Sequence, residues 1–207
     1  MACAAQTPAS IQATGSATIT VKPDQATLTV GVVTQATTAQ QAADMNASQA
    51  DAMIKALQGV LGSAGTIQTI SYSLSARYTN NGATIVGYTA SNTVLVTATN
   101  LSLIGPLIDA GNQAGANSIG GPSFGLQNDE PQRSQALAAA AKQALAHAAA
   151  IASGFGAKTG AVLAAQEGSS MTPIFNGASG AGSVATPIQT GTVTVSATVT
   201  VTVALVQ

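Results

Sequence analysis

The segment TVTVSATVTVTVAL, residues 192–205, alternates hydroxyl and apolar side chains more regularly than any other part of the chain. A period of two is typical of a β-strand with one buried face, because successive side chains point to opposite sides of a sheet. At about 3.3 Å per residue, such a strand is roughly 45–50 Å long. An uncharged strand of this length invites edge-to-edge pairing, so we expect it to be central in its sheet or deliberately paired.

Two stretches predict long helices that carry the same apolar stripe. Thr38, with Gln41 three residues later, forms a capping-box pattern, and Asp129 precedes Pro131 in the first turn of the second helix. In both stretches, apolar residues recur at steps of four and three, which places them on one helix face. The predicted stripes are Ala43, Ala47, Ala50, Ile54, Leu57 and Leu61, and Leu137, Ala141, Ala144, Ala148, Ile151 and Phe155.

The remaining periodic segments predict strands. Residues 67–78 and 84–99 form the arms of a long hairpin around Asn80-Asn81-Gly82, because Asn-Gly is a strong turn signal. Residues 16–21 and 26–32 predict a second hairpin around Pro23. A short helix over 102–113 and strands over 118–127 and 161–166 complete the pattern. The predicted fold class is α+β: antiparallel sheets with long hairpins, packed against two long helices and one short helix. Two pseudo-repeated strand-helix-strand-strand halves are one arrangement that fits it.

The predicted organisation is a flexible N-terminal segment or signal remnant over 1–14 and one domain over 15–207. The Gly-, Ser-, Ala- and Pro-rich stretch 168–189 is expected to be a flexible loop. Ala2-Cys3-Ala4 is similar to the end of a cleavage site, which suggests that a signal peptide was removed or replaced by Met1. Cys3 as a lipidated or disulfide-linked residue and an unremarkable N-terminus are the alternatives.

The chain is unusually poor in charge. Only 6% of its 207 residues are charged and the net charge is −1, whereas ordinary domains are about 25% charged. Six basic residues cannot form the footprint that binds phosphate backbones, so we expect no nucleic-acid partner. No apolar run approaches the roughly 20 residues that span a membrane. Near-zero net charge does little to prevent association, which favours self-assembly, although a compositional bias of the genome explains the same feature.

Few residues are available for catalysis or for a cofactor. His147 is the only histidine and Cys3 the only cysteine, so neither a zinc site nor a Ser-His-Asp triad is expected. The seven carboxylates fit turns, helix starts and solvated helix faces better than an acid-base pair. They are Asp24, Asp44, Asp51, Asp109, Asp129, Glu130 and Glu167. We therefore expect no enzyme, no cofactor and no metal.

Several segments, in order along residues 15–205, resemble the SIMPL (DUF541) family. The most specific are Pro23-Asp24-Gln25-Ala26, similar to its "PD.A" segment, and Gly87 to Asn92, similar to "GY.A.N". The others are Gly15 to Lys22, Ala42 to Asn46, Thr69 to Ser71 with Tyr78, Gly115 to Asn117 with Phe124, Pro187-Ile188 and Gly191 with the alternating strand. The low charge departs from what we expect of this family.

The resemblance implies an α+β fold, export to the periplasm or cell envelope, assembly into rings or hollow barrels in some members, and a link with stress tolerance. It implies no catalytic residues, because the family has no agreed activity. Our hypothesis is a non-enzymatic envelope protein that forms a homo-oligomer. The outside of the cell is an alternative location. A fibre subunit joined by strand pairing and a monomeric ligand-binding module under the 168–189 loop are the alternatives. The candidate interface comprises Tyr72, Tyr78, Asn81 and Tyr88 on the long hairpin.

Overall fold

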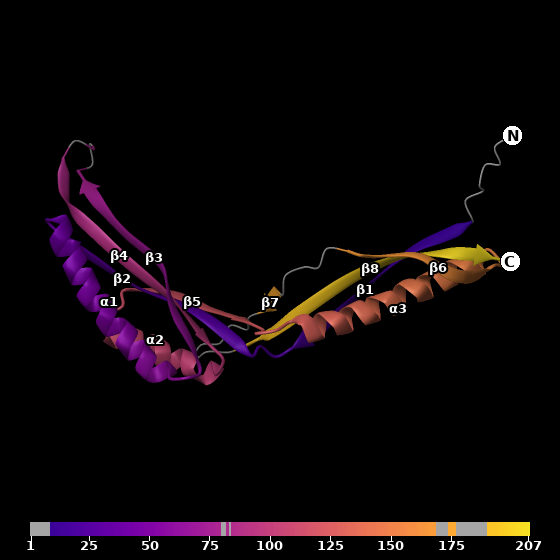
Figure 1. Cartoon of the computed structure of the whole chain (residues 1–207), viewed down its shortest axis with the longest axis horizontal. Helices are drawn as coiled ribbons and strands as arrows, with labels where there is room; N and C mark the ends of the chain where they lie inside the picture. Colours follow the sequence, from indigo (N-terminus) through magenta and orange to yellow (C-terminus); the bar gives the residue numbers. More distant parts are fainter. Residues whose placement is uncertain (1–8, 80–81, 83, 169–173, 177–189) are drawn as a thin grey trace. The chain divides into compact units, whose positions relative to one another are not determined.

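The computed structural model describes residues 9–79, 82, 84–168, 174–176 and 190–207. They form two compact units, which we name for their place in the sequence (Figure 1). The central unit is built from Lys22–Gln127. The terminal unit combines the stretch that ends at Val21 with Asn128–Asn176 and Thr192–Gln207. The range expected as one domain, 15–207, therefore contains parts of two units.

The central unit is an antiparallel sheet of order β3-β4-β2-β5 with α1 along one face (Figure 1). The long hairpin predicted around Gly82 is confirmed as β3 and β4. Thr38 caps α1 as expected, because its side chain accepts a hydrogen bond from the Gln41 backbone N–H. The elements are β2 (Gln25–Ala36), α1 (Ala39–Leu61), β3 (Gly65–Tyr78), β4 (Ile85–Ala98), the 3₁₀ turn η1 (Leu101–Leu103), α2 (Ile104–Gln113) and β5 (Ser118–Gly125).

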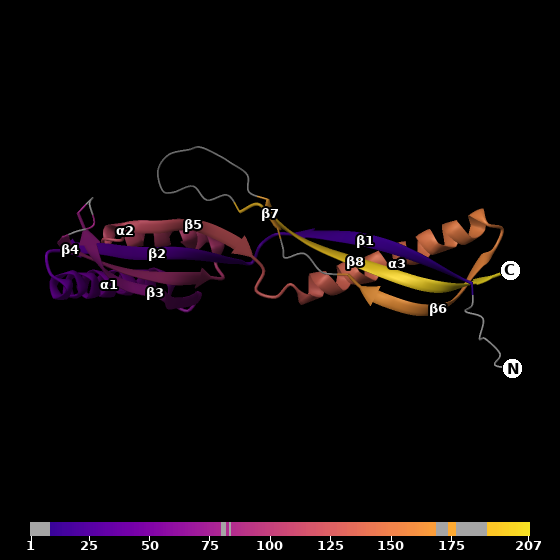
Figure 2. The same ribbon diagram turned by 90° about the horizontal axis from the view of Figure 1, so that it is seen from above.

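The terminal unit is an antiparallel sheet of order β1-β8-β6, with β7 also paired to β8. Helix α3 lies along β1 and β8 (Figures 1 and 2). The alternating segment 192–205 forms β8, which is central in this sheet and paired on both sides. The elements are β1 (Ser10–Val21), α3 (Glu130–Gly154), β6 (Lys158–Glu167), β7 (Ile174–Asn176) and β8 (Thr192–Val206).

The two units share one arrangement. In the central unit, β2 is followed by α1 and then by β3 and β4, which gives the order β3-β4-β2. In the terminal unit, β1, α3, β6 and β8 follow the same sequence and give β6-β8-β1. The central unit is inserted after β1, and β7 is an addition. This topology matches the two pseudo-repeated strand-helix-strand-strand halves suggested by the sequence.

The predicted hairpin of residues 16–21 and 26–32 is wrong. β1 pairs along its whole length with β8, from Ser10 opposite Ala204 to Val21 opposite Val193. Both edges of β2 are occupied by β4 and β5, so β2 has no edge left for β1. Residues 10–14, expected in the flexible N-terminal segment, form the first part of β1, because Ile11 and Ala13 are buried under α3.

The predicted stripe of α1 is correct only at Ala50, Leu57 and Leu61. The buried positions are Ala42, Asn46, Ala50, Met53, Leu57 and Leu61. The prediction used apolar residues alone. It therefore placed the first half of the stripe on the wrong positions, because the buried face contains the polar Asn46. Burial of this amide is possible because its two N–H groups donate to backbone carbonyls of the sheet.

Of the predicted stripe of α3, Ala144 and Ala148 are buried, and Leu137 and Ala141 are partly buried against the same core. The buried face consists entirely of alanine: Ala136, Ala140, Ala144, Ala148 and Ala152. The larger residues Ile151 and Phe155 are exposed. The reason is the close approach of α3 to β1 at Gly15, where even a methyl group would lie 2.2 Å from the Ala140 carbonyl oxygen. Only the smallest side chains fit between the helix and the sheet.

Three further expectations concern helix ends, loops and membrane spans. Asp129 occupies the N-cap position of α3 but makes no capping bond with its side chain. Instead, Asn128 Oδ1 accepts from the Glu130 N–H. Asn81 lies outside the described residues. So does the predicted loop over 168–189, except for Gly168 and the three residues of β7. Among the described helices, none is long and apolar enough to cross a membrane.

Candidate functional site

Strand β3 is an exposed edge of the central sheet. Among the residues that the structure describes, the order β3-β4-β2-β5 leaves one side of β3 without a neighbouring strand. Most of its fourteen residues are exposed, and Arg77 is its only charged residue. Ile70, Tyr72, Leu74 and Tyr78 on β3 and Ile85 and Val86 on β4 are exposed large apolar residues. Edges of natural sheets are commonly protected by charge, proline or a covering element, so a long apolar edge is a candidate pairing site.

The β1 edge of the terminal sheet shows what such protection looks like. The Ser16 backbone N–H donates to Gln143 Oε1 at 2.6 Å. His147 Nδ1 lies 2.9 Å from the Thr14 carbonyl oxygen. Both side chains come from α3, so the helix satisfies backbone groups on the side of β1 that faces away from β8. His147, the only histidine in the chain, therefore helps to fasten α3 to the backbone of β1.

The three candidate interface tyrosines lie on β3 and β4 but do not form one cluster. Tyr72 and Tyr78 are 55% and 57% exposed, whereas Tyr88 is half-buried. Tyr78 lies opposite Ile85, and Tyr88 lies opposite Ala76 rather than opposite Tyr78. Asn81 is outside the described residues. Tyr72 and Tyr78 remain as exposed candidates, and Tyr88 does not.

Leu74 is an interface candidate that sequence reasoning missed. Tyr72 lies opposite Asn92, and Leu74 opposite Ala90. Residues directly opposite on neighbouring strands share a face, so Tyr72 and Leu74 continue the face on which Ala90 is buried. The signal was present in the sequence SYSLSARY, residues 71–78, where aromatic and aliphatic residues alternate with serine and arginine. We name Tyr72, Leu74 and Tyr78 the β3 row.

Asn46, in one of the segments that carry the family resemblance, stabilises the packing of the central unit. Asn46 is fully buried, and its Nδ2 donates to the carbonyl oxygens of Val32 at 2.9 Å and Ala90 at 3.1 Å. It therefore joins α1 to both β2 and β4. Thr34 is buried next to it along β2 and donates to the Ala42 carbonyl oxygen at 2.8 Å. These bonds fix the first turns of α1 on the sheet.

Two other motif residues fix the ends of β5. Asn117 accepts from the Val33 N–H and donates to the Val33 carbonyl, both at 2.8 Å. Its own N–H donates to the Gly31 carbonyl oxygen at 3.1 Å, so Asn117 extends the pairing between β5 and β2. At the opposite end, the Asp24 N–H donates to the Gly125 carbonyl and its carboxylate accepts from the Gln127 N–H.

Replacing Asn117 with alanine is expected to destabilise the central unit by about 2 kcal/mol, because the Val33 N–H and C=O both lose their partner. Urea unfolding followed by far-UV circular dichroism measures this loss. Asn112→Ala, at an exposed position of α2, is the matched control. Equal stability of the two variants would contradict the conclusion that Asn117 stabilises the pairing of β5 with β2.

Several ionisable residues have side-chain partners. Asp51 contacts Lys55 at 2.7 Å, and Asp44 accepts from Gln40 at 2.8 Å, so these carboxylates lie on the solvated face of α1 as predicted. The hydrogen bond from Arg133 to Glu167, together with the charge of that carboxylate, raises the pKa of Arg133 above its ordinary value. No group of three or more potential metal ligands occurs among the described residues.

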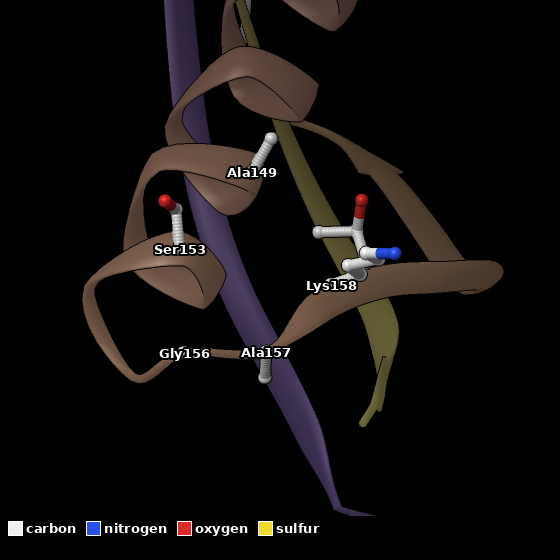
Figure 3. Close-up of a pocket in the computed structure, with 6 residues that line it drawn as sticks. Ala149, Ser153, Gly156, Ala157 and Lys158 are labelled. Atoms are coloured by element: carbon white, nitrogen blue, oxygen red, sulfur yellow. The ribbon is translucent and has the colours of Figure 1, made fainter.

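A pocket of about 440 Å³ lies where α3 ends and β6 begins (Figure 3). Ala149, Ser153, Gly156, Ala157, Lys158 and Thr159 line it. Lys158 is its only charged residue, and the lining provides no carboxylate, thiol or imidazole. The sequence analysis did not identify this pocket, because its residues are small and follow no motif.

One family model matches most of the chain. The model of the family described as "SIMPL: Protein of unknown function (DUF541)" matches residues 11–203. This range contains all the motif residues described above. No curated protein matches the chain.

Proposed function

Because the chain belongs to the SIMPL (DUF541) family, whose description assigns no function, we propose a function from its surfaces: a non-enzymatic protein that assembles with copies of itself through β3. One observation carries this proposal. β3 is a fourteen-residue sheet edge with one charged residue and an exposed apolar row beside its open side. A strand of a second copy would complete the hydrogen bonding of this edge and cover the β3 row.

The low charge of the chain supports the same proposal. With a net charge of −1, two approaching copies repel one another weakly. Tyrosine and leucine in the β3 row supply apolar area without a buried charge that would need a partner. The proposal includes a location in the cell envelope, which the resemblance implies, and fractionation of cells that express the tagged protein tests that part separately.

Leu74→Lys is expected to weaken the assembly at least about tenfold, because each interface would bury an unpaired ammonium group. Light scattering on the purified protein measures the effect, with and without reductant. The wild type should show a discrete mass that is a multiple of 20.1 kDa, and the variant should dissociate at concentrations where the wild type does not.

Leu145→Lys is the matched control. Leu74 and Leu145 are 42% and 41% exposed, but Leu145 lies on α3 in the terminal unit. The same chemical change at equal exposure should leave the mass unchanged. A monomeric wild type, or an equal loss of mass in both variants, would refute assembly through β3.

A fibre is the second candidate, and the topology of the terminal unit favours it. β6 corresponds to β3 in the shared arrangement and is also a largely exposed sheet edge. Pairing of β3 with β6 of the next copy would be heterologous, so it forms a closed ring or an open fibre according to the rotation between copies. Sedimentation distinguishes the two, because a ring gives one sharp boundary and a fibre pellets.

A further inference from the structure

The end of the terminal unit where α3 meets β6 exposes large apolar side chains. Phe155, directly after α3, is 77% exposed, the highest value among the exposed large apolar residues of the described chain. Ile151 is also exposed and lies one helical turn earlier, so the two share a helix face. Val206, opposite Lys158 across the β6–β8 pair, is exposed at the same end. We name Ile151, Phe155, Lys158 and Val206 the tip.

The charge at the tip is restricted to one cation. Between His147 and Gln166, Lys158 is the only charged side chain. It lines the open pocket with the hydroxyl-bearing Ser153 and Thr159 (Figure 3). The residues around Phe155 are alanine, serine and glycine. An apolar surface with a single ammonium group and hydroxyl donors is complementary to the interface of a phospholipid membrane, where acyl chains lie beneath anionic phosphates.

The path of the chain brings its N-terminal side to the same end. Ser10 pairs with Ala204, and the Leu205 N–H donates to the Ala9 carbonyl oxygen at 2.8 Å. β6 also begins here, because Lys158 lies opposite Val206. Ala9 and the start of β1 therefore lie at the same end of the terminal unit as the tip.

We propose that the tip binds the surface of a phospholipid membrane. Phe155 and Ile151 enter the boundary between headgroups and acyl chains, and Lys158 contacts lipid phosphate at the pocket. This proposal uses the terminal unit and is independent of the β3 row. Burial of one phenylalanine contributes about 2 kcal/mol, and one lysine near an anionic leaflet contributes about 1 kcal/mol. Such binding is weak and reversible, and a second attachment or several linked copies strengthen it.

The chain contains no tryptophan, so Phe155→Trp introduces a single fluorescent reporter at the tip of the full-length protein. Titration with millimolar vesicles of phosphatidylcholine and phosphatidylglycerol is expected to shift its emission to shorter wavelength. Brominated acyl chains should quench it. Vesicles of phosphatidylcholine alone should produce a smaller change at equal lipid concentration, because Lys158 then meets no net anionic surface.

Met45→Trp is the control, because Met45 is exposed on α1 of the central unit and lies outside the β3 row. Its emission should show no quenching by brominated lipid. Absence of quenching at position 155, or equal quenching at both positions, would overturn the proposal. A shift that appears on raising the protein concentration without vesicles would assign the tip to a second copy and would also overturn it. Light scattering on the same lipid-free samples reports separately on assembly through β3.

Discussion

Gly15→Ala is expected to destabilise the terminal unit by about 3 kcal/mol, although it adds only one methyl group. The added carbon would lie 2.2 Å from the Ala140 carbonyl oxygen and 2.4 Å from the Ala144 backbone nitrogen. Both are backbone atoms of α3, so no side-chain rotation relieves the clash and the whole helix must move off β1. Urea unfolding followed by the helical signal in far-UV circular dichroism measures the loss.

Gly154→Ala is the matched control, with the same chemical change in the same unit. Its new methyl group would meet no atom within 4 Å. Because alanine favours the helix over glycine, this variant should be more stable than the wild type by up to about 1 kcal/mol. The two substitutions thus have opposite expected signs. If Gly15→Ala were as stable as Gly154→Ala, the close packing of α3 on β1 would be refuted.

Local patterns were sufficient where an element pairs with its neighbour in sequence. The Asn-Gly turn and its two alternating arms predicted β3 and β4, and the capping box predicted the start of α1. The period of two predicted β8 as a strand. In each case the information lies within one segment, because turn geometry and side-chain alternation are local properties.

Pairing between distant segments was not predictable in this way. β1 and β8 are separated by most of the chain, and the Lys22-Pro23-Asp24 segment between β1 and β2 looks like the turn of a hairpin. Nothing in a single sequence indicates that both edges of β2 are occupied by β4 and β5. The partner of a strand depends on the whole topology, and a turn signal reports only that the chain changes direction.

The face of α3 was mispredicted because large apolar residues were assumed to point inward. Gly15 permits an approach so close that only alanine fits, which leaves Ile151 and Phe155 outside. A repeat of alanine at every fourth position, from Ala136 to Ala152, was the available signal. For the candidate site, Tyr72 and Tyr78 were identified from residue type alone. Leu74 was missed although it alternates in step with Tyr72 in the sequence, and the register with β4 shows that the two share a face.

Asn46→Asp is expected to destabilise the central unit by about 3–5 kcal/mol at neutral pH, because it places an unpaired charge in the interior. Asn46 is fully buried, and its Oδ1 has no hydrogen-bond donor among the described residues. The Nδ2 position faces the carbonyl oxygens of Val32 and Ala90, which would repel a carboxylate. A substitution that preserves size and shape therefore removes both donors and adds a charge.

The same variant should show a stability that depends on pH in a defined direction. Burial raises the pKa of the introduced carboxyl in the folded state above its value of about 3.9 in the unfolded chain. Below that unfolded value both states are neutral, and the protonated carboxyl donates one hydrogen bond, so the loss relative to the wild type is smallest there. As the pH rises toward the folded-state pKa, the loss grows by about 1.4 kcal/mol per pH unit. Urea midpoints of variant and wild type, compared at each pH, measure it.

Asn46→Leu separates the charge from the lost donors. Leucine is close in volume and cannot ionise, so its loss relative to the wild type should be about 1–3 kcal/mol and the same at every pH. If Asn46→Asp showed the same pH-independent loss as Asn46→Leu, water would reach position 46 in solution. The packing of α1 against β2 and β4 would then be looser than in the structure. If instead only Asn46→Asp loses more stability as the pH rises, position 46 is shielded from water. The hydrogen bonds of Asn46 then determine how α1 packs on the sheet.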